Sequence, residues 1–223
     1  MGAITRVAGT GTVGDSGDDG PATDAELNNP GAVAVTADGG FLIADAGNNE
    51  VRKVSSAGVI TRVAGTGTAG NSGDDGLATD AELNFPTGVA VTADGGFLIA
   101  DAGNDEVRKV SSAGVITRVA GTGTVGDSGD GGPATDAELF SPTEVAVTAD
   151  GGFLIADANN NVVRKVSSKG VITRVAGTGT KGDSGDDGPA TDAELFIPIR
   201  VAVTADGGFL IADVGNNVVR KVA

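Results

Sequence analysis

The side chains that could do chemistry are mostly carboxylates, and they gather in a glycine-rich loop that occurs four times. In its first copy, Asp15-Ser16-Gly17-Asp18-Asp19-Gly20 is followed by Glu26. Counted from Asp15, the fifth residue is an acid, the sixth is Gly and the twelfth is Glu, a spacing that resembles a calcium-binding EF-hand loop. The candidate ligands for Ca²⁺ are Asp15, Asp19, Glu26, Asp183, Asp187 and Glu194.

Several residues in this loop argue against a calcium site. Gly17 stands at the third ligand position without a side chain, and Asn71 and Gly131 replace acids in the second and third copies. The alternative is that Thr23-x-x-Glu26 is a capping box that begins a one-turn helix, because Ser/Thr and Glu at this spacing satisfy free backbone N–H groups. We therefore expect no resident cofactor, with Ca²⁺ as the weaker hypothesis.

The composition excludes other chemistry. The chain has no Cys, His, Tyr or Trp, which removes disulfides, thiolate and imidazole catalysis and the usual zinc sites. The net charge is −15, so neither nucleic acid nor an anionic membrane surface is expected as a partner. Apolar runs are too short to span a membrane, and the start of the chain does not look like a signal peptide. The localisation stays unknown, and we expect a soluble, non-enzymatic protein that is compatible with cytoplasmic expression.

The whole sequence around these loops repeats along the chain. The string ITRVAGTGT begins at Ile4, Ile60, Ile116 and Ile172, a period of 56 residues. The units run over 2–57, 58–113, 114–169 and 170–223, and we assign all of 1–223 to one domain. Their near-identity indicates recent duplication or deliberate engineering.

Each unit predicts four short antiparallel strands and one long loop. In the first unit the strands are expected at 32–37, 41–44 and 51–54, and the fourth at 59–64. Asp38-Gly39-Gly40 separates the first two strands, and Asp-Gly favours a tight hairpin because Gly adopts positive φ easily. The fold class is therefore all-β.

Two stretches of each unit carry a family resemblance. In the first unit, GTGTVGDSGDDGPATDAELNNP is followed by GAVAVTADGGFLIADAGNNEVRKV. This resembles the NHL-repeat family, with its Gly-rich lead, Pro-x-Gly-Val-Ala-Val strand, L-x-I-A-D segment, G-N-N turn and V-R-K-V strand. The resemblance implies a β-propeller, commonly six-bladed, that is used for binding. Phe41 stands one position before the usual aromatic residue, and the common Tyr is missing.

The chain order predicts how the ring closes. Residues 4–8 match the fourth strand of a unit, whereas the chain ends on a third strand at 218–222, so these two segments are expected to complete one blade. Closing four blades alone opens wide gaps between outer strands, and unfilled cavities are costly. We therefore predict that two chains form an eight-bladed ring, a homodimer, with a four-bladed monomer as the alternative.

The differences between units cluster on one face. They fall just before the first strand, in the turn between the second and third strands, and in the long loop. Our main interpretation is a non-catalytic repeat scaffold without a dedicated natural ligand. The alternatives are a protein, peptide or glycan binding module on this face, and a calcium-binding propeller. The candidate binding residues are Asn29, Phe85, Glu144, Ile197, Ile199 and Arg200.

The remaining charges are expected to be structural. Asp45 and its three equivalents end the second strand, where Asp commonly accepts hydrogen bonds from turn N–H groups. A ring of such carboxylates around a cation is the alternative. Arg52 and Arg62, with their equivalents, are expected along exposed blade edges, where ion pairs contribute about 0–1 kcal/mol each.

Overall fold

The computed structural model describes residues 2–223, which form four antiparallel sheets. The all-β prediction of four blades per chain is confirmed. The strands of blades 1 and 2 are β1 (Pro30–Val35), β2 (Phe41–Asp45), β3 (Glu50–Val54), β4 (Ile60–Ala64), β5 (Pro86–Val91), β6 (Phe97–Asp101), β7 (Glu106–Val110) and β8 (Ile116–Ala120). Those of blades 3 and 4 are β9 (Pro142–Val147), β10 (Phe153–Asp157), β11 (Val162–Val166), β12 (Ile172–Ala176), β13 (Pro198–Val203), β14 (Phe209–Asp213) and β15 (Val218–Val222).

Single-turn 3₁₀ helices punctuate the loops. Those in the long loops are η1 (Ala22–Asp24), η3 (Ala78–Asp80), η5 (Ala134–Asp136) and η7 (Ala190–Asp192). Those after each second strand are η2 (Ala46–Asn48), η4 (Ala102–Asn104), η6 (Ala158–Asn160) and η8 (Val214–Asn216). The one-turn helix is confirmed, but the capping box is wrong. Pro21 occupies the cap position, Thr23 lies inside the helix, and Glu26 accepts a hydrogen bond from Ser16 instead.

The first hairpin shows why strand bounds differ from the prediction. β1 begins at Pro30 and ends at Val35, two residues earlier than expected at both ends. Thr36 already belongs to the turn, because its N–H donates to the carbonyl of Gly40 at 2.9 Å. Gly39 adopts a φ of +82°, which residues with a Cβ rarely adopt.

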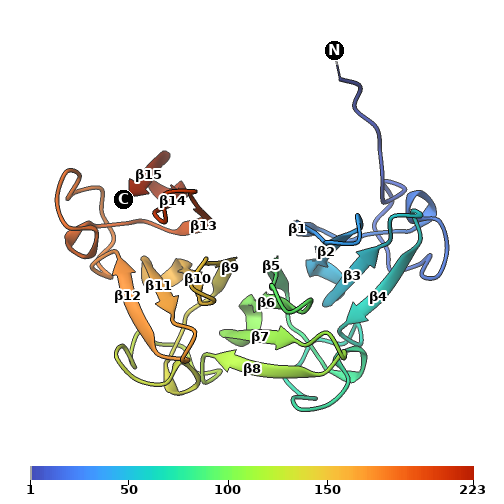
Figure 1. Cartoon of the computed structure of the whole chain (residues 1–223), viewed down its shortest axis with the longest axis horizontal. Helices are drawn as coiled ribbons and strands as arrows, with labels where there is room; N and C mark the ends of the chain where they lie inside the picture. The colour runs from blue at the N-terminus through green and yellow to red at the C-terminus, as the bar shows by residue number, and fades with distance from the viewer. Residues whose placement is uncertain (1) are drawn as a thin grey trace.

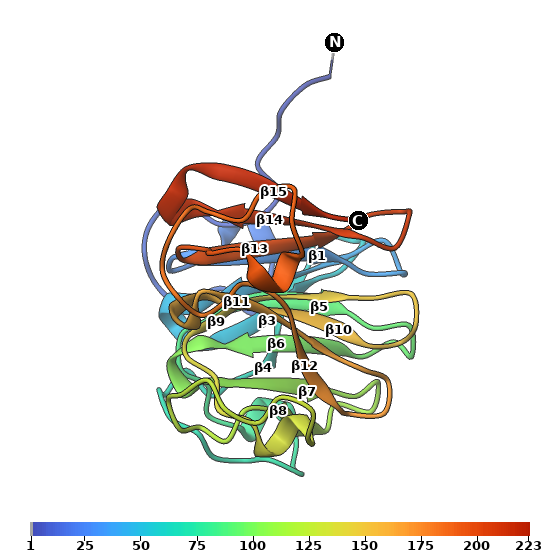
Figure 2. The same ribbon diagram turned by 90° about the vertical axis from the view of Figure 1, so that its left-hand side faces the viewer.

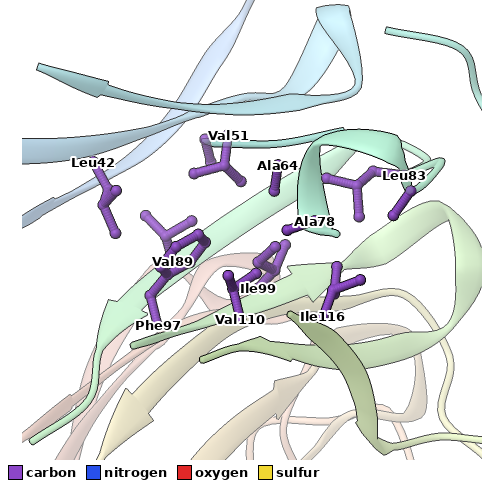
Figure 3. Close-up of a cluster of buried hydrophobic side chains, with 12 residues drawn as sticks. Leu42, Val51, Ala64, Ala78, Leu83, Val89, Phe97, Ile99, Val110 and Ile116 are labelled. Carbon is purple, nitrogen blue, oxygen red and sulfur yellow. The ribbon is translucent and has the colours of Figure 1, made fainter. Parts of the chain in front are cut away.

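The hydrophobic core lies between the blades. Figure 3 shows the cluster between blades 1 and 2, where Leu42 and Val51 face Val89 and Ile99, and Leu83 covers the cluster from the long loop. Similar clusters lie between blades 2 and 3 and between blades 3 and 4. Burying each such aliphatic side chain stabilises the fold by roughly 1.5–3 kcal/mol, so each blade depends on its neighbours.

The four blades form an open arc (Figure 1), in which β13 and β1 face each other across the opening. Blades 1 to 3 have four strands, whereas blade 4 has three. Residues 4–8 belong to no sheet among the described residues and extend away from the blades (Figures 1 and 2). Within one chain they therefore do not pair with β15, because the open arc leaves the two segments apart.

Candidate functional site

Each blade contains an arginine that binds the acidic loop, and this arginine is fully buried in blades 1 to 3. The Arg52 side chain is fully buried, and its Nε and Nη2 donate to Asp18 Oδ1 at 3.0 and 2.8 Å. Its Nη1 donates to the carbonyl of Glu26 at 2.7 Å. The predicted exposed position of Arg52 is therefore wrong, because the loop folds over β3 and covers it. The same ion pair recurs as Arg108–Asp74, Arg164–Asp130 and Arg220–Asp186.

A second buried carboxylate completes this network. Asp45 accepts hydrogen bonds from the N–H of Asn28 at 2.7 Å and from Asn48 Nδ2 at 2.9 Å, and its Oδ2 lies 3.6 Å from Arg52 Nη1. The side chain is thus structural, as predicted, but it anchors the incoming loop through Asn28. Burial raises the pKa of the equivalent Asp101 to about 7, against the opposing effect of its hydrogen bonds and Arg108.

The calcium candidates do not converge in the structure. Glu26 Oε2 accepts from Ser16 Oγ at 3.1 Å, and Glu194 Oε2 accepts from Ser184 Oγ at 3.0 Å. Asp19 and Asp187 occupy turn positions with positive φ. Across residues 2–223 we find no group of three potential metal-ligating side chains. The spacing that resembles an EF-hand therefore produces a turn that presents Asp18 to Arg52.

Two glutamates that sequence reasoning did not select, Glu50 and Glu106, lie buried at the starts of β3 and β7. Glu50 Oε1 lies 3.6 Å from Arg62 Nη1, while its Oε2 has no hydrogen-bond partner. Burial, and then the nearby charge of Asp15, raise the pKa of Glu50 to about 8. In blade 2, Asn71 replaces Asp15 and donates to Glu106 Oε1 at 3.3 Å.

Blade 3 has different residues at the position equivalent to Glu50 and around it. Val162 replaces the glutamate, and Asp127 pairs with Arg174 at 2.9 Å. Burial also raises the pKa of Asp127, whose Oδ1 has no hydrogen-bond partner. The signal in the sequence was the pattern of differences between units, since Glu is replaced by Val at this position in the third and fourth units.

The predicted binding face contains a strained position in every blade. Asn29, Phe85 and Ile197 have φ values of 51°, 52° and 53°. The N–H of Phe85 donates to Asn49 Oδ1 at 2.9 Å, and that of Ile197 donates to Asn161 Oδ1 at 3.0 Å. Positive φ is costly for a β-branched residue such as Ile197, so these inter-blade hydrogen bonds hold the backbone in place.

The other three predicted binding residues meet near the arc opening. Arg200 Nε lies 3.5 Å from Glu144 Oε2, and Thr143 Oγ1 donates to the carbonyl of Ile199 at 2.9 Å. Arg200 Nη2 donates at 2.7 Å to the carbonyl of Gly31, which belongs to blade 1. Burial raises the pKa of Glu144 to about 7, and Arg200 opposes this shift. In contrast, Asn29, Phe85 and Ile197 each lie in a different blade.

A large hollow opens at the other end of the strands. It has a volume of about 1980 Å³, and its lining includes Val35, Val91 and Val147 with the turn residues Asp38 and Asp94. These positions do not vary between the units. The hollow and the varied face therefore lie at opposite ends of the blades.

Comparison with known proteins assigns the repeat. The NHL repeat family matches residues 83–110, which include β5, β6 and β7. Equivalent segments occur in the other three blades. The chain is an NHL-repeat propeller. It is 32% identical to mouse Teneurin-4 over 92% of its length and 29% identical to mouse Teneurin-1 over 93%. It spans 8% of the length of each of these relatives.

Solved structures agree with the NHL-repeat fold. A protein of unknown function from Bacteroides thetaiotaomicron has a TM-score of 0.69 and 22% identity, over 87% of this chain and 47% of that one. A gluconolactonase from Xanthomonas campestris has a TM-score of 0.60 and 16% identity, over 88% and 59% of the two chains. A streptogramin B lyase has a TM-score of 0.55 and 13% identity, over 85% and 53%. Similar folds therefore include enzymes. None of the helices described here has the length and apolar character to cross a membrane.

Proposed function

We propose that this NHL-repeat chain is a non-catalytic scaffold without a dedicated small-molecule ligand, produced by recent duplication or by engineering. The observation that carries the proposal is the repeated network of Arg52, Asp18 and Asp45. Its charged groups are engaged with one another and with the backbone, in the same way in every blade. Groups used to hold a loop on a strand are not free to bind a substrate.

The varied residues near the arc opening also satisfy one another. Glu144 pairs with Arg200, and Arg200 donates to backbone carbonyls of both blade 3 and blade 1. This pair supports a role in fixing the blades relative to each other. Acid–base work would instead need a carboxylate within hydrogen-bond reach of a bound substrate.

The test uses the reaction classes of the structural relatives. Sugar-lactone hydrolysis is followed with a pH indicator, and streptogramin B linearisation by absorbance. We expect rates equal to those in buffer, with Glu144→Gln and Asp24→Asn indistinguishable from the parent chain. A rate well above buffer that Glu144→Gln removes and Asp24→Asn leaves intact would overturn the proposal.

A binding module on the varied face is the second candidate. The observation that favours it is the exposure of Phe85 and Phe140, two aromatic side chains that stand where the first unit has Asn. Aromatic side chains contribute strongly at protein interfaces. A chain carrying Phe85→Asn and Phe140→Asn should keep its melting temperature and lose any captured peptide or glycan. Retained binding would exclude this face.

A further inference from the structure

Blade 4 lacks an outer strand, and a segment with the sequence of that strand lies outside the sheets at the start of the chain. In blades 1 to 3 the outer strand has the sequence ITRVA, which is also the sequence of residues 4–8. Ile60, Ile116 and Ile172 are 0% exposed, whereas Ile4 is 100% exposed. Ile4 is therefore exposed, although its equivalents in the other three units are buried.

The loop of the fourth unit has matching free backbone groups. In blade 1, the N–H of Asp19 donates to the carbonyl of Ile60, the N–H of Ile60 to the carbonyl of Gly20, and the N–H of Ala22 to the carbonyl of Gly58, at 2.8, 3.0 and 2.8 Å. Blades 2 and 3 repeat these three bonds. Within residues 2–223, the equivalent groups of Asp187, Gly188 and Ala190 form none of them.

The faces at the two ends of the arc are the two halves of an interior blade interface. In blade 4, Leu210 is 37% exposed and Val219 is 71% exposed, whereas their equivalents in blade 2, Leu98 and Val107, are 2% and 0% exposed. At the other end of the arc, Val33 of blade 1 is 69% exposed and Val89 of blade 2 is 4%. The exposed face of blade 4 and the exposed face of blade 1 are thus the two apolar surfaces that pack together at the interior blade interfaces.

We propose that two copies of this chain join end to end, with blade 4 of each packed on blade 1 of the other. Residues 4–8 of one copy then become the fourth strand beside β15 of its partner. The register follows from the β3–β4 ladder, in which Lys53 lies opposite Thr61 and Val54 opposite Ile60. Thr5 would therefore lie opposite Lys221 of the other copy, and Ile4 opposite Val222.

A second copy can cover the apolar faces at both ends, whereas within the chain the hydrogen bond from Arg200 to Gly31 spans the opening and leaves those faces exposed. The blades pack closely along their inner strands, since a Cβ added to Gly88 would lie 2.9 Å from the carbonyl oxygen of Thr143 in the next blade. Closing four blades alone would require each interface to open into a wider wedge, with the cavities that this creates.

The test is a disulfide trap in a chain that has no cysteine of its own. We expect light scattering at micromolar concentration to give about twice the 21.6 kDa chain mass. Thr5→Cys combined with Lys221→Cys should, after oxidation, run as a covalent dimer on a denaturing gel without reductant. Thr5→Cys combined with Lys53→Cys is the mismatched control and should stay at the single-chain mass, because β4 already covers β3.

Point variants supply an independent readout. Ile4→Asp and Val219→Asp should shift the mass toward one chain, whereas Val13→Lys should not, since Lys181 occupies the equivalent position in unit four. A single-chain mass with a cross-link inside the chain would establish the four-bladed ring and overturn the proposal. A mass of three or more chains would also overturn it. Mass and cross-linking do not depend on the outcome of the lactone and lyase assays.

Discussion

Blades 2 and 4 contain the same network in two different surroundings. Arg108 and Arg220 both bind an acid of the long loop, at 2.8 and 2.7 Å. The side chain of Arg108 is fully buried and that of Asp74 is one-third exposed, whereas Asp186 in blade 4 is 75% exposed. The residues and distances match, so the difference in burial comes entirely from the neighbouring blade and outer strand that blade 4 lacks. A blade of this propeller is therefore only as stable as its neighbours make it.

The largest expected effect is the loss of stability when Arg108 is replaced, compared with the loss when Arg220 is replaced. Arg108→Met should lower the free energy of unfolding by about 3–5 kcal/mol, because it leaves a buried carboxylate without its partner. Arg220→Met should cost less, about 1–2 kcal/mol, because water reaches both Arg220 and its loop partner Asp186, so that only Asp213 stays buried without a cation. Denaturant unfolding at a concentration where the chain has its single-chain mass measures both. Equal losses under that condition would break the comparison.

Leu98 and Leu210 extend the comparison of blades 2 and 4 to an apolar side chain. Leu98 is buried between blades 2 and 3, whereas Leu210 lies on the open face of blade 4. Leu98→Ala should cost about 2–5 kcal/mol, and Leu210→Ala about 1 kcal/mol or less in the single chain. The cost of Leu210→Ala should rise with protein concentration if blade 4 becomes covered by a second copy. Thermal unfolding at two concentrations measures this change.

The buried Glu50 sharpens the comparison through pH. Its pKa is raised to about 8 in the fold, so the neutral form is favoured and its contribution to stability is complete only below its unfolded pKa near 4.3. This contribution is lost as the pH rises toward 8. The melting temperature of the parent chain should therefore fall between pH 5 and 9. In Glu50→Gln it should fall by a few degrees less, since 1 kcal/mol corresponds to roughly 2–4 °C in a chain of this size.

Matched variants complete the pH experiment. The exposed Asp24→Asn should leave the pH profile of the parent chain unchanged. Blade 3 has Val162 at the position of Glu50, so Glu50→Val tests whether the apolar solution also suits blade 1. A profile that keeps its slope in Glu50→Gln would show that other groups control the alkaline loss of stability.

Calcium should have the smallest effect. Asp18 is already engaged by Arg52, and Glu26 accepts from Ser16, so the acidic loop offers few free ligands in the described structure. Millimolar Ca²⁺ should change the melting temperature by no more than about one or two degrees, since a ligand that binds the native state tightly raises it much further by mass action. A rise of many degrees, reversed by EDTA, would restore the EF-hand interpretation.

Local patterns predicted the blades well. The alternation around Val33, the Asp38-Gly39-Gly40 turn and the short FLIAD strand specify hairpins through interactions close in sequence. The same logic failed at Arg52 and Thr23. A strand residue and a loop residue 34 positions apart become partners only when the loop folds over the sheet, and Pro21 takes the cap position that the Thr23 motif suggested.

The candidate site was predicted only in part. Glu144, Ile199 and Arg200 were selected because the units differ there, and they do lie together. Their pairing, and the contact of Arg200 with Gly31, depend on how blades 3, 4 and 1 curve around the arc. The buried Glu50 was missed, because nothing about a glutamate at the start of a strand indicates that the next unit's loop will cover it.

The repeat, its period and the four-stranded blade could be predicted from the amino-acid sequence, because they follow from hydrophobic alternation and turn residues within each unit. The propeller class was predicted from the resemblance to the NHL-repeat family. Which charges are buried, which face of each blade is covered, and that residues 4–8 lie outside the four sheets depend on contacts between units, so these features came from the three-dimensional fold. The physical reason is that identical units have identical local preferences, whereas burial depends on the position of each unit in the arc. Blades 2 and 4 therefore share nearly the same residues, yet Leu210 and Val219 of blade 4 are exposed where Leu98 and Val107 of blade 2 are buried.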